Sequence, residues 1–334
     1  MIEATASGRL LSIHYLRGVA ALMVVAVHCF TTGLVAVPDP ARFAWLKHGV
    51  ELFFLISGFV MVASTQGRDI SPAEFLRRRA VRIVPLYWIM TAGFAVMAGG
   101  VDVRWLLASL FFVPLPNGQG GVLDPVLQLG WTLNFEMFFY ALFALSLLLP
   151  RATRLPAVTG ALLALAIAGA IMPLPQPLAW YASKELLLFA AGMAAANFSW
   201  RLPPWAIFAG FAGLVLGWTV TDIALLSVYI PALLVLLGSR SLDLEMLPAR
   251  FPVLLGDASY ALYLSHPLAL QIAFVALRPA LPPVLLLPVV LAFAVAIAVL
   301  IYRAVELPAG RIAERLLRMP RVFSRSALRS IGPV

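Results

Sequence analysis

The sequence is poor in charge and in cysteine. Only 12% of its 334 residues are Asp, Glu, Lys or Arg, whereas 62% are hydrophobic, and Cys29 is the single cysteine. Since about a quarter of the residues of a typical soluble domain are charged, this composition excludes an ordinary soluble fold. A single cysteine excludes an internal disulfide, and a thiol within an apolar run is expected to serve packing rather than chemistry.

Histidine is also scarce. The four histidines show no close spacing to cysteine or to carboxylates of the kind that a zinc site requires. We therefore expect no metal and no bound cofactor. The four are His14, His28, His48 and His266.

Apolar runs, in contrast, recur along the whole chain. A helix of about 17 to 25 apolar residues crosses the roughly 30 Å of hydrocarbon in a bilayer, and the runs have about this length. The sequence predicts an all-α transmembrane bundle of about ten spans, the first of them not a cleaved signal peptide. Residues 1–310 would form this domain and residues 311–334 a basic cytoplasmic tail. The expected spans are 10–33, 48–65, 81–98, 126–149, 156–172, 180–198, 204–220, 223–238, 252–275 and 283–303.

The net charge of +9 follows a membrane pattern. With the N-terminus inside, most arginines fall in cytoplasmic segments, as the positive-inside rule requires for an even number of spans. We therefore expect both termini in the cytoplasm and no nucleic acid as a partner. The apolar segment 105–113 is too short to cross, and we expect it to be a re-entrant or surface helix on the outer side.

The first span carries Arg17 and His28, eleven residues apart. At 100° per residue both lie on nearly the same helix face, about 16 Å apart along the axis. Since ionisable groups inside a span are costly, this pair indicates a lined cavity. The alternative is an arginine that reaches the cytoplasmic surface and a histidine that is hydrogen-bonded within the bundle.

Two carboxylates are expected within the outer half of the membrane. Glu51 begins the second span at a depth close to that of His28, where it could orient the imidazole and stabilise its charge. Glu136 lies about seven residues inside the fourth span, with no basic residue near it in sequence, so it is a functional candidate. The alternatives are an interfacial Glu51 in contact with water and a structural role for Glu136.

Three arginines precede and enter the third span. Arg78, Arg79 and Arg82 share one side of a helix, so their like charges are crowded unless an anion neutralises them. A polyphosphate ligand would suit the geometry of the guanidinium groups. Positive-inside bias alone could also produce such a cluster.

The ninth span contains a polar stripe. Ser259, Tyr263 and His266 are spaced by four and three residues, and Pro267 follows them. This stripe is either a substrate-binding surface or a network that packs helices together. The candidate substrate-binding residues are Trp131, Asn134, Ser259, Tyr260, Tyr263 and His266.

Together these segments resemble one family. Five motifs are similar to the hallmarks of the acyltransferase-3 family of bacterial integral membrane acyltransferases. They are Arg17-x10-His28, GVELFFLISGF, RRAVR followed by PLYW, WTLNFE and SYALYLSHP. The amino-acid sequence around WTLNFE is especially similar to that of the exopolysaccharide O-acetyltransferase branch. The resemblance extends from about residue 12 to about residue 308.

The resemblance implies a function. Members transfer an acyl group, usually acetyl, from cytoplasmic acyl-CoA to a sugar hydroxyl of a surface polysaccharide or its lipid-linked precursor, at the bacterial inner membrane. It implies that Arg17 and His28 are essential, that Arg78, Arg79 and Arg82 match the arginine pattern, and that the acidic position matches Glu136. The chain departs from the pattern by having Glu51 where aspartate is common and by lacking an esterase-like domain.

The pieces then fit one reaction. The expected catalytic residues are His28, Glu136 and Glu51. Arg17, Arg78, Arg79 and Arg82 would bind acyl-CoA. The expected partners are acyl-CoA, a saccharide acceptor, the lipid bilayer and proteins of polysaccharide biosynthesis. His28 would act as general base, with Glu51 or Glu136 fixing its tautomer, or it would form an acyl-imidazole.

The rival interpretation is a transporter or flippase, with the same ionisable groups as a proton relay. A scaffold without catalysis is the third interpretation. Acyl transfer by purified protein separates the enzyme from both.

Overall fold

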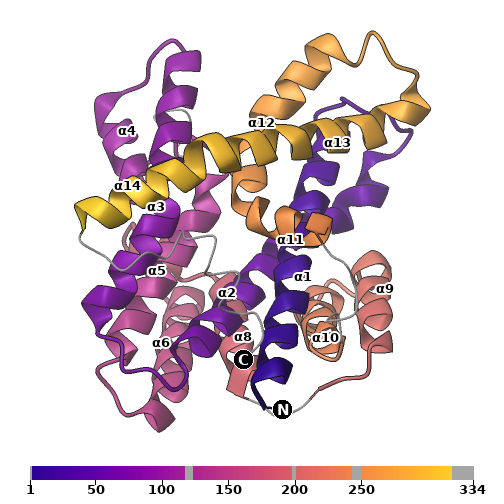
Figure 1. Ribbon diagram of the computed structural model, residues 1–334. Helices are drawn as coiled ribbons and strands as arrows, with labels where there is room; N and C mark the ends of the chain where they lie inside the picture. Colours follow the sequence, from indigo (N-terminus) through magenta and orange to yellow (C-terminus); the bar gives the residue numbers. More distant parts are fainter. Residues whose placement is uncertain (1, 117–122, 198–200, 243–249, 318–334) are drawn as a thin grey trace. The chain divides into compact units, whose positions relative to one another are not determined.

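The computed structural model describes residues 2–116, 123–197, 201–242 and 250–317. Within these ranges every regular element is a helix, so the predicted all-α class is confirmed for the described part of the chain (Figure 1). In the same ranges, five helical segments are long and apolar enough to cross a membrane. They are Leu11–Thr31, Pro40–Thr65, Pro72–Met97, Arg151–Ile171 and Leu285–Leu316.

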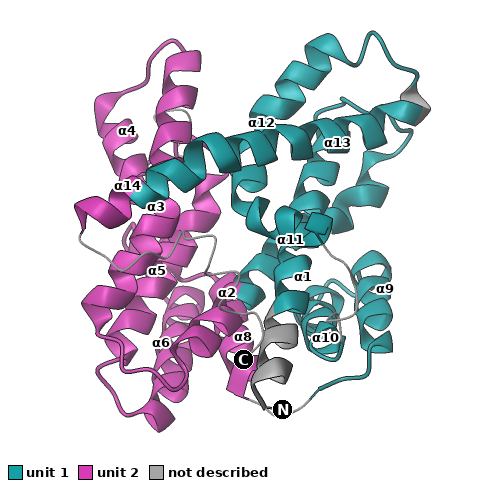
Figure 2. Cartoon of the chain, viewed as in Figure 1, with its two compact units in different colours: residues 1–56, 199–311, 320–334 teal, residues 57–198, 312–319 magenta. Residues whose placement is uncertain are grey.

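The helices form two compact units, which Figure 2 colours separately. Unit 1 comprises residues 1–56, 199–311 and 320–334, and unit 2 comprises residues 57–198 and 312–319. Helix α2 (Gly49–Thr65) contributes its first half to unit 1 and its second half to unit 2. Helix α14 (Leu307–Leu316) is divided in the same way.

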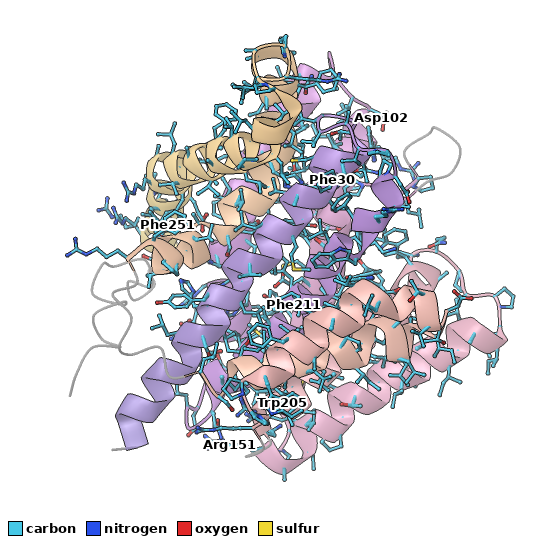
Figure 3. The ribbon with its side chains drawn as sticks, turned by 90° about the vertical axis from the view of Figure 1, so that its right-hand side faces the viewer. Phe30, Asp102, Arg151, Trp205, Phe211 and Phe251 are labelled. Atoms are coloured by element: carbon cyan, nitrogen blue, oxygen red, sulfur yellow. The ribbon has the colours of Figure 1, made fainter. Side chains whose placement is uncertain are left out.

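Unit 1 is organised around α1 (Ile2–Thr31). This helix contacts η1, α10, α11, α12 and α13, so the segment with Arg17 and His28 forms the centre of the unit. Figure 3 labels Phe30 near the end of α1. The Phe30 ring stacks on Phe43 of η1 with ring centroids 4.0 Å apart. The further elements of unit 1 are η1 (Pro40–His48), α9 (Trp205–Val220), the π-helical turn η3 (Leu225–Tyr229), α10 (Ile230–Ser239), α11 (Arg250–Asp257), α12 (Ser259–Ala276), α13 (Pro283–Ile301) and the π-helical turn η4 (Tyr302–Glu306).

A glycine lets α1 and α11 approach closely. A Cβ atom at Gly256 would lie only 2.5 Å from Cδ2 of His14 and 2.6 Å from the His14 carbonyl oxygen. The His14 Nε2–H group is 3.1 Å from the Val253 carbonyl oxygen and 3.2 Å from Oδ1 of Asp257. Small residues at such crossings allow tight packing without a large side chain between the helices.

Unit 2 joins the second half of α2 to the helices of the middle of the chain. Here α3 packs on α4 and α5, and α6 packs on α5, α7 and α8. Gly58 of α2 allows a close approach to α8, because a Cβ atom there would lie 2.0 Å from the Phe189 carbonyl oxygen. The elements are α3 (Pro72–Met97), α4 (Val103–Leu110), α5 (Gly130–Ser146), α6 (Arg151–Ile171), α7 (Leu178–Tyr181), η2 (Lys184–Leu186) and α8 (Leu187–Asn197).

Helical segments lie within each of the ten expected span positions, but several bounds differ, and the sixth position is divided among α7, η2 and α8. The ninth is divided at Ala258 into α11 and α12, and the last continues through η4 and α14, beyond residue 311, to Leu316. The number of crossings and the cytoplasmic location of both ends stay predictions. Residues 318–334 of the expected tail lie outside the described residues.

The third expected span begins earlier than expected, at Pro72 rather than residue 81. Ser71 is the N-cap residue, whose side chain accepts a hydrogen bond from the Glu74 backbone N–H, and proline occupies the first turn. This Ser-Pro-Ala-Glu sequence is a capping box, a helix start that can be recognised from sequence. The arginine cluster therefore lies on α3 itself, not in a preceding loop.

Helix α4 (Val103–Leu110) begins two residues before the expected segment 105–113 and covers its first part. Asp102 caps this helix through its side chain, which accepts a hydrogen bond from the Trp105 backbone N–H at 2.9 Å. Eight helical residues extend only about 12 Å, so α4 is too short to cross a bilayer.

Candidate functional site

His28 is held by its own helix. Its Nδ1 atom lies 2.7 Å from the carbonyl oxygen of Val24, one turn earlier in α1. Because a carbonyl oxygen can only accept, Nδ1 carries the proton and Nε2 of the neutral ring has the lone pair. That tautomer is the one required of a general base acting through Nε2.

His266 lies against His28, with ring centroids 4.9 Å apart and ring planes inclined by 50°. Its side chain is completely buried, and its Nδ1 atom is 2.8 Å from the Tyr263 carbonyl oxygen. That carbonyl lacks its usual helical donor, since the residue four positions later is Pro267, which has no N–H. The histidine side chain replaces the missing donor, and its Nε2 atom is left buried without a hydrogen-bond partner.

Tyr263 completes what we call the histidine cluster, namely His28, Tyr263 and His266. The Tyr263 ring lies 6.2 Å from His266 and contacts Phe53 edge-on at 5.7 Å. Of the other candidates in this span, Tyr260 is buried, and the Ser259 hydroxyl donates to the Gly256 carbonyl oxygen at 2.7 Å. Ser259 therefore stabilises the junction between α11 and α12.

Glu51 has a different partner from the one expected. Its Oε1 atom is 3.0 Å from Nδ1 of His48, and its Oε2 atom is buried without a hydrogen-bond partner. The His28 tautomer is fixed by the Val24 carbonyl, so neither Glu51 nor Glu136 is needed for that task. The spacing of His48 and Glu51 on adjacent turns could have shown this pair from sequence alone.

Glu136 is the centre of a second group, in unit 2. Its Oε1 atom accepts hydrogen bonds from the Ser57 hydroxyl at 2.7 Å and from the Tyr140 hydroxyl. Arg79 lies close enough for its charge to interact with that of Glu136. We call Ser57, Arg79, Glu136 and Tyr140 the carboxylate cluster.

The register of α3 against α5 explains why the charge of Arg79 acts on Glu136. The Phe75 ring packs against Phe143 at 5.0 Å, and a Cβ atom at Gly130 would lie 2.6 Å from the Tyr87 hydroxyl oxygen. The two helices are thus antiparallel, and the arginines of α3 lie level with the stretch of α5 that carries Glu136. We expected the arginines at the cytoplasmic mouth and Glu136 in the outer half, whereas unit 2 brings them to one level.

The arginine cluster is also less crowded with like charge than the sequence suggested. Glu74 accepts hydrogen bonds from Nε of Arg78 at 2.7 Å and from the Arg77 guanidinium at 2.5 Å. Arg79 lies over the Phe75 ring, 5.5 Å from its centroid, and its Nε atom has no hydrogen-bond partner. The neutralising anion for Arg78, and for its neighbour Arg77, is therefore a residue of the same helix, and a polyphosphate is not required to explain these two arginines.

The remaining predicted site residues lie as follows. Arg17 is half-buried in α1 of unit 1, and Arg82 is half-buried in α3 of unit 2. Trp131 and Asn134 lie on the first turns of α5. Among the described residues, no three His, Cys, Asp or Glu side chains form a group that could hold a metal ion.

Sequence reasoning missed Ser57, Tyr140 and His48. Tyr140 follows Glu136 by four residues, so the helical spacing already predicted a contact. Ser57 carried no such indication, because it comes from a different helix and meets Glu136 only in the folded unit.

Comparisons with known proteins identify the family of the chain. Residues 10–303 match the acyltransferase-3 family, which is described as an acyltransferase domain. The match covers most of the chain, so the protein belongs to that family. It is a helical protein with several candidate membrane spans, and its family and its apolar helices make it a multi-pass membrane protein.

Two relatives are similar to the chain. The exopolysaccharide production protein ExoZ of Rhizobium meliloti (strain 1021) is 40% identical over 249 residues, which are 67% of this chain and 76% of ExoZ. Nodulation protein 10 of Rhizobium leguminosarum bv. viciae is 30% identical over 130 residues, which are 30% of this chain and 35% of that protein. No solved structure matches the chain.

Proposed function

We propose that the protein is a membrane O-acyltransferase of the bacterial inner membrane. It moves an acyl group from cytoplasmic acyl-CoA to a sugar hydroxyl, and the preferred acyl group is acetyl. The sugar belongs to an exported or cell-surface polysaccharide or to its lipid-linked precursor. The family supports acyl transfer, and the name of the relative ExoZ supports exopolysaccharide as the acceptor. Proteins of polysaccharide biosynthesis are the expected partners.

The observation that carries this proposal is the fixed tautomer of His28. A half-buried imidazole whose Nδ1–H is occupied by a backbone carbonyl offers its Nε2 lone pair to a hydroxyl proton. The hydroxyl oxygen then attacks the thioester carbon, the carbon–sulfur bond breaks, and the imidazolium returns the proton to the CoA thiolate. Such proton transfer contributes about 10² to 10⁴ in rate.

The arginines and Glu136 would serve the donor side in unit 2. Arg78, Arg79 and Arg82 present guanidinium groups, which suit the phosphates of acyl-CoA. Arg17, in unit 1, is proposed to meet the pyrophosphate or the pantetheine amides. Glu136, anchored by two hydroxyl groups, would hold Arg79 in place and provide a second carboxylate for acid–base chemistry.

The direct test uses the full chain in lipid nanodiscs, where both faces of the membrane are accessible. The protein is incubated with radiolabelled acetyl-CoA and with deacylated polysaccharide from a strain that lacks it. We expect label to enter the polysaccharide. Unlabelled succinyl-CoA or longer acyl-CoA should reduce this label only slightly, because we expect these donors to compete poorly with acetyl-CoA. Transport of a lipid-linked sugar without any acyl transfer would support the flippase alternative instead.

The same assay without acceptor separates direct transfer from an acyl-enzyme. Label that stays on wild-type protein but not on a His28→Ala variant would indicate an acyl-imidazole. The absence of protein-bound label supports the general-base mechanism proposed here.

A further inference from the structure

The described part of unit 2 contains a group of five aromatic rings that the proposed chemistry does not use. We call this group the aromatic cluster, and it joins the start of α5 to α7. Phe135 lies 5.7 Å from both Trp131 and Trp180, and Phe138 stacks on Tyr181 at 4.3 Å with an interplanar angle of 13°. The members are Trp131, Phe135, Phe138, Trp180 and Tyr181.

Helical spacing explains how α5 presents this group. Residues 131, 134, 135 and 138 follow the i, i+3, i+4, i+7 pattern and so share one face of the helix. Glu136 and Tyr140 lie on the opposite face. Since a helix with its side chains is about 10 to 12 Å wide, the aromatic cluster is separate from the carboxylate cluster.

Two polar groups on this side of the unit are buried without partners. Asn134, which shares the aromatic face of α5, is 1% exposed, and neither its amide oxygen nor its amide nitrogen has a hydrogen-bond partner. The indole Nε1–H of Trp180 is also buried without an acceptor. Buried polar groups without partners are rare in native proteins because they lose their hydrogen bonds to water, so each one calls for an explanation.

Other tryptophans of the same unit show that an unpaired indole is not the general case. Trp88 donates its Nε1–H to the Leu110 carbonyl oxygen at 2.8 Å, and Trp105 donates to that of Asp124 at 2.8 Å. Aromatic residues at a membrane interface keep their polar ends in water. A simple interfacial belt therefore does not explain the buried Nε1 of Trp180 or the buried amide of Asn134.

We propose that the aromatic cluster, with Asn134 and the indole N–H of Trp180, is a binding subsite for a neutral saccharide. A sugar ring has a face of C–H groups, which packs on the negative face of an aromatic ring, and hydroxyl groups, which both donate and accept hydrogen bonds. Asn134 supplies a donor and an acceptor, and Trp180 supplies a donor. An anionic ligand would need cations, and the cluster and Asn134 contain none.

This inference rests on the proposed function and extends it to the length of the acceptor. The cluster and Glu136 occupy opposite faces of α5, so we assign the cluster to sugars of the acceptor chain other than the one that is acylated. Long oligosaccharides would gain binding energy from the cluster, whereas an acceptor of one or two sugars would not reach it.

The test compares acceptors of different length in nanodiscs with acetyl-CoA as donor. The acceptors are oligosaccharides obtained by partial hydrolysis of the polysaccharide from a strain that lacks this protein, separated into short and long fractions. Trp180→Phe removes the N–H and keeps a ring, and Asn134→Leu removes the amide at similar volume. For each variant we expect the KM for long acceptors to rise about 2- to 13-fold, the equivalent of one hydrogen bond. The KM for short acceptors, the KM for acetyl-CoA and kcat should stay unchanged.

Thermal unfolding gives a second readout. Because each substitution removes an unpaired buried group, we expect the Tm to stay constant or to increase. Trp88→Phe is the matched control, since it removes an indole N–H that already has a partner, and it should leave the KM for long acceptors unchanged.

Each outcome decides between the claims. Equal effects on short and long acceptors, or no effect on either, would overturn the saccharide subsite while leaving the transferase intact. Wild-type protein that transfers no acyl group to any fraction would overturn the proposed function itself.

Discussion

The histidine cluster of unit 1 and the carboxylate cluster of unit 2 are built in different ways. His28 and His266 each donate Nδ1–H to a backbone carbonyl of their own helix, three or four residues earlier. Glu136 instead accepts hydrogen bonds from side chains, one of them on α2, and interacts with Arg79 of α3. The orientation of the histidines is thus a local property, whereas that of the carboxylate depends on the packing of three helices.

The difference predicts how each cluster responds to change. A histidine held by its own backbone keeps its tautomer as long as the helix exists, so only replacement of the histidine itself removes the base. A carboxylate held by side chains can be loosened through its neighbours while it stays in place. Substitutions in the two clusters should therefore show different patterns.

The largest expected effect is at His28. His28→Ala should lower the rate of acyl transfer by about 10² to 10⁴, because the Nε2 base is lost. Membrane insertion and the elution volume in size-exclusion chromatography should not change, since alanine suits a helix. Val19→Ala, at an exposed position of the same helix, is the control. Retention of more than a few per cent of the activity would remove His28 from the chemistry.

A smaller effect is expected at the carboxylates. Glu136→Gln should lower kcat by about 100-fold if the charge takes part in acid–base chemistry. Glu51→Gln should have a weaker effect, because Glu51 is paired with His48 in the other unit. Initial rates at saturating acetyl-CoA measure the effect of each substitution on kcat. A near-normal rate for Glu136→Gln would assign Glu136 a structural role.

The hydroxyl groups around Glu136 test whether side chains position it. Tyr140→Phe and Ser57→Ala should each lower kcat about 10-fold with little change in either KM, because a hydrogen bond to a charged group contributes about 1.5 to 3 kcal/mol. In a Glu136→Gln background the same substitutions should have little further effect, since they act through that carboxylate. Full additivity in this double-mutant cycle would contradict a positioning role.

The arginines should affect donor binding more than chemistry. Arg82→Ala should raise the KM for acetyl-CoA about 5-fold and leave that for the acceptor unchanged, with partial rescue by Arg82→Lys. Glu74→Gln should lower the KM for acetyl-CoA about 2- to 3-fold, since it releases Arg77 and Arg78 from their ion pairs. A defect confined to the acceptor would mean that the cluster binds a lipid-linked sugar phosphate.

The last prediction concerns membrane topology and is tested by thiol labelling, not by a change in the rate of acyl transfer. In a Cys29→Ser background, a cysteine in the loop 173–179 should react with an impermeant thiol reagent from outside the cell. A cysteine in place of Arg151 should not react. The reverse pattern would mean that the segment around α4 crosses the membrane, and the expected depth of Glu136 would be wrong.

The sequence by itself determined the helical class and the family, and it placed most of the long helices, although α3 begins at Pro72 rather than residue 81 and η1 was not expected. Apolar runs and the positive-inside pattern depend on the bilayer as solvent, which acts on each segment separately. The Nδ1 partners of His28 and His266 are carbonyls of the same helix, three or four residues earlier, so these contacts need no second helix. Pro267 even predicts which carbonyl lacks its donor. These features are local.

Only the tertiary structure decided which distant groups meet. Gly58 lets α2 approach α8, and Ser57 of the same helix donates a hydrogen bond to Glu136. The antiparallel register of α3 and α5 brings the charge of Arg79 within range of that carboxylate. The pairing of Trp180 with Phe135 is likewise invisible in the sequence. Periodicity gives the face of a helix on which a residue lies, but not the helix that this face meets, because that choice depends on how all the side chains of a unit pack together.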